Sequence, residues 1–131
     1  MSFDVYFQRF VDGDADESGR DEVVAVLAPY LKPSVETPGR IEHPAGNADV
    51  YGLGDGDGDG DGDGMMINHI EDGLWDLLVE AARAGRWAIM PIGCPTCVFN
   101  AAMLANLPED LRQDAVVVNS GADVRDLIAN S

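Results

Sequence analysis

The chain is poor in cysteine, poor in positive charge and without a long apolar segment. Its 131 residues include two cysteines with only two residues between them, so they cannot staple distant segments as in a secreted disulfide-rich domain. No apolar run approaches the ~20 residues that a membrane-spanning helix needs, and the first residues lack the basic and apolar regions of a signal peptide. We therefore expect a soluble, cytoplasmic protein.

The shortage of positive charge restricts the partners of the protein. Eight residues are lysine or arginine and 24 are aspartate or glutamate, which gives a net charge of −16. Such a surface repels the phosphate groups of nucleic acids and of anionic membranes, so we expect neither as a partner. A basic protein is the partner class that this charge favours, although acidity alone also serves solubility.

Hydrophobic periodicity supplies most of the structural information. Residues 2–10 alternate, with Phe3, Val5 and Phe7 on one face, as in a half-buried strand. The clearest helical stripe is formed by Leu74, Leu77, Leu78, Ala81 and Ala82. Their spacing of three and four residues predicts an amphipathic helix. Residues 86–92 are apolar on both faces and predict a central strand, in which Pro91 indicates either the end of the strand or a bulge.

Two short motifs predict where helices begin. Residues 18–21 (Ser-Gly-Arg-Asp) and 120–123 (Ser-Gly-Ala-Asp) both have the spacing of a capping box. A further apolar helix is predicted at residues 98–107, immediately after the second cysteine. The predicted order of elements is β-α-β-β-β-α-β-α-β-α.

This order mixes hairpins with helical crossovers, which is typical of the α+β class. We expect one domain over residues 1–131, large enough to bury a core of its own. Its sheet should be mixed and mostly antiparallel, with about five to six strands and with helices packed largely on one face.

The two cysteines form a Cys-Pro-Thr-Cys motif at Cys94 and Cys97, between a predicted strand and a predicted helix. Three interpretations fit. A helix N-terminus would favour a thiolate and a redox dithiol. Two thiolates with His43 and His69 would match the ligand count of a zinc site, although the histidines lack the spacing of a zinc finger. Alternatively, both thiols fill space beside the sheet, as free cysteines often do.

A second unusual segment is residues 54–64, in which glycine and aspartate alternate strictly. The glycine spacing does not match a dinucleotide-binding motif, and no acidic residue closes an EF-hand loop. Weak cation binding remains open for the carboxylates of Asp55, Asp57, Asp59, Asp61 and Asp63. The alternative is a flexible acidic loop that connects two strands, where extra length has little energetic effect.

One resemblance is visible. The opening Met-Ser-Phe-Asp-Val-Tyr and the later segments 82–85, 107–111 and 116–121 resemble a loose group of small uncharacterised bacterial proteins that open M-S-F-D-[VI]-Y. No activity is attached to this group, so the resemblance implies no site residue. The Cys pair and the Gly-Asp run depart from its pattern.

Recognisable catalytic motifs are missing from the sequence. It has no G-x-S-x-G, no H-E-x-x-H and no phosphate-binding loop, and we predict no cofactor. The acidic surface and the small single domain favour a non-enzymatic protein-binding module, immunity-like or regulatory, with a basic protein as its partner. The alternative functions are thiol redox or zinc binding through Cys94 and Cys97, or weak calcium binding by the aspartate run.

Overall fold

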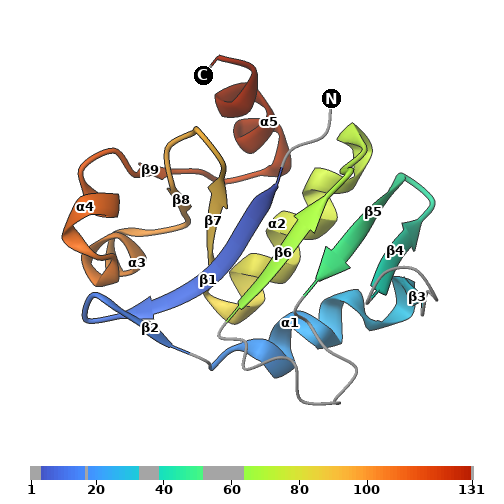
Figure 1. Ribbon diagram of the computed structural model, residues 1–131, viewed down its shortest axis with the longest axis horizontal. Helices are drawn as coiled ribbons and strands as arrows, with labels where there is room; N and C mark the ends of the chain where they lie inside the picture. The colour runs from blue at the N-terminus through green and yellow to red at the C-terminus, as the bar shows by residue number, and fades with distance from the viewer. Residues whose placement is uncertain (1–3, 17, 33–38, 52–63, 131) are drawn as a thin grey trace.

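The computed structural model describes residues 4–16, 18–32, 39–51 and 64–130 (Figure 1). The strands are β1 (Val5–Val11), β2 (Asp14–Asp16), β3 (Leu31–Lys32), β4 (Gly39–His43), β5 (Gly46–Tyr51), β6 (Gly64–Asn68), β7 (Ala88–Pro91), β8 (Cys97–Val98) and β9 (Val116–Val117). The helices are α1 (Arg20–Leu27), α2 (Trp75–Gly85), α3 (Ala101–Asn106), α4 (Glu109–Arg112) and α5 (Gly121–Ala129), with 3-10 turns η1 (Ala28–Tyr30) and η2 (Asp72–Leu74).

The fold is α+β with a mixed, mostly antiparallel sheet, as predicted, but the sheet has nine strands instead of five to six. The order is β3-β4-β5-β6-β1-β7-β8-β9, and β2 pairs with β1. All described pairings are antiparallel except that of β8 with β9. The strands that were not predicted, β2, β3 and β8, have only two or three residues each, too few to show an alternating pattern.

Strand β1 occupies the centre of the sheet, between β6 and β7. The predicted alternation is confirmed, since Val5 and Phe7 are buried while Tyr6, between them, is 45 % exposed. Residues on the Phe7 side of the sheet face the main core, and residues on the Tyr6 side face away from it. We call the Tyr6 side the open face.

The three longest helices, α1, α2 and α5, contribute to the main core (Figure 1). The predicted stripe of α2 is confirmed, because its leucines and alanines are buried there. Gly85 allows α1 to approach α2 closely, since a Cβ at this position would lie 2.4 Å from Val23 Cγ2. The short helices α3 and α4 pack instead on a second, smaller cluster formed by Ala88, Val98 and Leu107.

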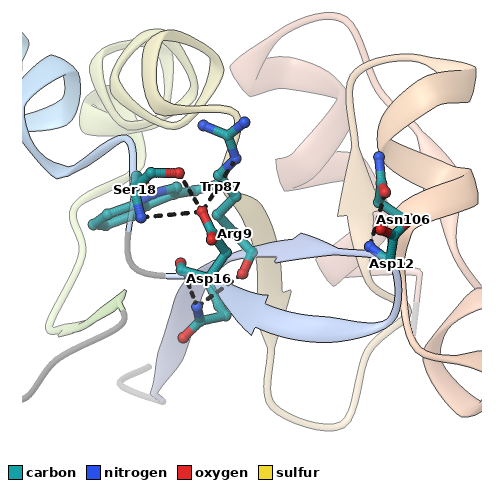
Figure 2. A network of polar contacts seen from close by, with 7 residues as sticks. Arg9, Asp12, Asp16, Ser18, Trp87 and Asn106 are labelled. Atoms are coloured by element: carbon teal, nitrogen blue, oxygen red, sulfur yellow. Dashed lines mark hydrogen bonds and ion pairs between the residues drawn. The ribbon is translucent and has the colours of Figure 1, made fainter.

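One predicted helix start is confirmed and the other is wrong. Ser120 caps α5 by accepting a hydrogen bond from Asp123 N. At α1 the cap residue is Gly19, with φ at 90° and no side-chain cap, while the Ser18 hydroxyl hydrogen-bonds to Asp16 Oδ2. Ser18 is held in place by Trp87, whose indole Nε1 donates to its carbonyl oxygen at 3.0 Å (Figure 2).

The segment after the cysteines also differs from expectation. The predicted helix over residues 98–107 begins only at Ala101, capped by Asn100, because Cys97 and Val98 are paired as strand β8 between β7 and β9. Most of the Gly-Asp run lies outside the described residues, but the strands flanking it, β5 and β6, pair antiparallel. In the described part of the chain no helix is long and apolar enough to cross a membrane.

Candidate functional site

The structure places the cysteine pair at a strand and not at a helix N-terminus. Cys97 is fully buried in β8, where it pairs with Ile89 and Val116. Cys94 is half-buried in the turn before β8, and both thiols are free. Burial, and secondarily the neighbouring Cys94, raises the pKa of the Cys97 thiol to about 12. The helix-dipole argument for a reactive thiolate therefore does not apply to Cys97.

The two histidines are not brought to the cysteines. His43 ends β4, where its ring lies 4.4 Å from that of Tyr30, and its Nδ1 accepts a hydrogen bond from Ala45 N at 3.0 Å. His69 follows β6 and places Nδ1 2.8 Å from Asp49 Oδ2. Strands β5, β6, β1 and β7 separate β4 from β8.

Neighbouring strands of a sheet lie ~4.8 Å apart, so β4 and β8 are too far from each other for His43 and Cys97 to bind the same metal ion. Among the residues that the structure describes, no group of three or more histidine, cysteine, aspartate or glutamate side chains could hold a metal ion. The weak-cation candidates Asp55, Asp57, Asp59, Asp61 and Asp63 lie outside the described residues.

The feature that sequence reasoning missed is a row of large side chains across the open face. Tyr6 of β1 pairs with Met90 of β7 on one side and with Met66 of β6 on the other, and Met66 in turn pairs with Tyr51 of β5. Directly opposite residues on neighbouring strands project on the same face. Met90, Tyr6, Met66 and Tyr51 therefore form one line over four adjacent strands, which we call the apolar row.

The apolar row lines a shallow groove. All four of its side chains border a depression of about 590 Å³, and Phe10 and Ala15 from the β1–β2 hairpin border the same depression. Tyr6 is 45 % exposed, and the other three are half-buried. Alternation within β1 indicates that Tyr6 faces outward, but the register between strands, which creates the row, depends on long-range pairing that no local pattern reveals.

A polar row lies beside the apolar row on the same face, formed by Asp4, Asn68 and Asp49. Asn68 pairs with Asp49, and its Nδ2 donates to Asp4 Oδ1 at 3.2 Å. The buried oxygen Oδ1 of Asn68 has no hydrogen-bond partner among the described residues. The polar row thus contains a buried acceptor between two carboxylates, of which Asp49 also contacts Arg40 Nη1 at 3.7 Å.

Comparisons with protein-family models, with curated proteins and with solved structures give no match. The chemical character of the site therefore rests on its own geometry. An apolar strip beside hydrogen-bond acceptors suits a surface that combines apolar and cationic groups.

Proposed function

We propose that this chain is a non-enzymatic protein-binding module, of the immunity or regulatory type, that binds a basic protein partner on the open face of its sheet. The observation that carries this proposal is the apolar row, because it runs beside the polar row over neighbouring strands of a rigid sheet.

The composition of the apolar row supports contact with another protein. Tyrosine and methionine are enriched at protein interfaces, and methionine adapts its shape to irregular surfaces. Helices α1, α2 and α5 pack on the opposite face, and α3 and α4 cover the sheet near β8 and leave the groove open over β5, β6, β1 and β7. A partner that inserts apolar side chains between Tyr6 and Met66 would remove this surface from water.

The charge of the protein and of the site favours a basic partner. Asp49 is already in contact with Arg40 Nη1 at 3.7 Å and with His69 Nδ1 at 2.8 Å, so Asp4 is the carboxylate of the polar row that a lysine or arginine side chain of the partner would contact. The net charge of −16 would attract such a partner from a distance and accelerate its association at low salt. A partner segment that alternates basic and apolar residues satisfies both rows at once.

This proposal is tested with two synthetic peptides, one alternating leucine with lysine and one alternating leucine with glutamate. We expect the leucine-lysine peptide to bind with an affinity that falls as salt rises, and the leucine-glutamate peptide to show no binding. Because any acidic protein attracts a cationic peptide, the deciding comparison uses variants. Replacing Tyr6 and Met66 together by serine should weaken binding about tenfold or more.

The matched control is Val117→Ser, which alters an exposed apolar residue in β9, outside the apolar row. It should bind as the parent does. For the charge, Asp4→Asn should weaken binding and Asp110→Asn, in the distant helix α4, should have less effect. Equal binding by the parent and the Tyr6/Met66 double variant would place the contact elsewhere and refute the proposal.

A further inference from the structure

A pocket of about 330 Å³ lies at the end of the sheet, where the β1–β2 hairpin meets α3 and the start of β7. Ala88, Val98 and Leu107, all nearly inaccessible to solvent, lie beneath its apolar wall, and the half-buried side chains of Phe10 and Met103 form the surface of that wall. This volume falls within the range of small-molecule sites, and the wall is part of the smaller core, so it is already formed without a ligand. The pocket contains no residue of the apolar row, although Phe10 borders both the pocket and the groove of the open face.

The walls are fixed by hydrogen bonds between the hairpin and α3. Asn106 Oδ1 accepts from Asp12 N at 2.9 Å (Figure 2). Asn106 Nδ2 donates to Ala102 O at 2.9 Å. Gly13 N also donates to Asn106 O at 2.9 Å. These contacts hold the hairpin turn against the helix and leave the pocket between them.

The charge of the pocket is opposite to that of the protein. Arg9 and Arg86 line it, and none of its eleven described lining residues is acidic, although 24 residues of the chain are. Asp16 contacts Arg9 from outside the lining, with 3.7 Å between Arg9 Nε and Asp16 Oδ2 (Figure 2). This contact offsets one of the two positive charges, so the pocket retains about one, which matches a monoanion.

Arg86 is the unusual residue of the pocket. It terminates α2 in the left-handed conformation, with φ at 59° and ψ at 40°, a position at which glycine or asparagine is usual. Its side chain makes no hydrogen bond or ion pair with any residue that the structure describes. Arginine thus occupies a backbone conformation that disfavours it, and no described contact of its side chain within the protein accounts for its presence there.

We propose that this pocket binds a small organic monocarboxylate, with the carboxylate between Arg86 and Arg9 and the hydrocarbon body against Phe10 and Met103. Guanidinium groups recognise carboxylates through paired, charge-assisted hydrogen bonds. The apolar wall selects for a ligand with a hydrocarbon chain over an inorganic anion.

The test is calorimetric titration of the full chain with the straight-chain carboxylates from butanoate to octanoate. We expect one site, with affinity rising up to about fourfold for each added methylene until the wall is covered. Octanol and octylamine should bind far more weakly than octanoate, because neither carries a negative charge that can accept hydrogen bonds from the arginine side chains. Inorganic phosphate should not displace octanoate at equal concentration.

Arg86→Gly is the deciding variant, because glycine suits the left-handed conformation. It should melt at a temperature no lower than that of the parent and should bind octanoate about tenfold more weakly or worse. Arg125→Gln removes one positive charge from α5, outside the pocket, and should bind as the parent does.

The proposal is wrong if octanoate binds Arg86→Gly as tightly as the parent, or if phosphate competes as well as octanoate. It is also wrong if octanoate shifts the methyl resonances of Met66 and Met90 and leaves that of Met103 unchanged, since this would place the hydrocarbon chain in the groove of the open face. Failure of the peptide experiment would not affect this result, because the two sites have different polar groups.

Discussion

The two faces of the sheet differ most sharply at consecutive residues of β1. Phe7 is 1 % exposed and belongs to the main core with α1, α2 and α5, whereas Tyr6 is 45 % exposed on the open face. Both are large aromatic residues in the same strand, so their difference arises from what lies over each face. Helices α1, α2 and α5 close one face and stabilise the fold, whereas the other face is the one on which we propose that a partner binds.

This comparison predicts that stability and binding are separable. Phe7→Ala should lower the free energy of unfolding by about 3–5 kcal/mol, because it removes a buried aromatic side chain and leaves a cavity. Tyr6→Ala should lower it by less than about 1 kcal/mol, because the side chain is half in water. Urea denaturation of the two variants measures both values. Similar losses for the two would mean that the open face is part of the core.

The two cysteines allow a second comparison between a core residue and a more exposed one, because Cys97 belongs to the main core and Cys94 lies in a turn. The pKa of Cys97 is raised to about 12 in the folded protein, against about 8.5 for a free thiol. The folded state therefore holds this proton more tightly than the unfolded state. The stabilisation is complete below pH 8.5 and is lost as the pH rises toward 12.

We expect the free energy of unfolding to fall by up to about 1.4 kcal/mol per pH unit through this window. In Cys97→Val, which keeps a buried apolar side chain without a titrating group, the fall should be shallower. Denaturation at several pH values measures the difference. In the folded protein at neutral pH, a chromogenic disulfide should react more slowly with Cys97 than with Cys94, and the opposite order would restore the redox hypothesis.

Sequence predictions were correct where a structure depends on residues close together in the chain, and they failed where it depends on contacts between distant residues. The strand at β1 and the helix at α2 were predicted because their hydrophobic residues repeat locally over many positions. The capping boxes show where this information ends. Ser120 caps its helix, whereas the hydroxyl of Ser18, in a motif with the same spacing, hydrogen-bonds to Asp16. The carbonyl oxygen of Ser18 accepts a hydrogen bond from the indole of Trp87, 69 residues further along the chain.

The candidate site depended even more on long-range pairing. Cys97 was expected before a helix, but its pairing with Ile89 and Val116 makes it a strand residue. Tyr6 and Met90 are far apart in the sequence and become neighbours only through the register of β1 and β7. Arg86 and Arg9 likewise line one pocket because β1 pairs with β7, with Gln8 opposite Ala88.

The smallest effect is expected for the Gly-Asp run. Replacing residues 54–63 by Asn-Gly retains Gly64, where a Cβ would lie 2.0 Å from Phe7 O. Because loop-closure entropy changes slowly with loop length, the melting temperature should change by no more than a few degrees. A calcium-dependent rise in the melting temperature of the parent, absent from this variant, would instead identify the run as a cation site.

The most direct test of the central claim, that the open face is the binding surface, is nuclear magnetic resonance of methionine methyl groups. Met66 and Met90 belong to the apolar row, Met65 is buried in the main core, and Met103 lines the pocket beside α3. On titration with the leucine-lysine peptide, the account predicts that the signals of Met66 and Met90 shift and that of Met103 stays in place, while Met65, which is buried but also borders the groove, shifts less than Met66. Shifts at Met103 without shifts at Met66 and Met90 would contradict it.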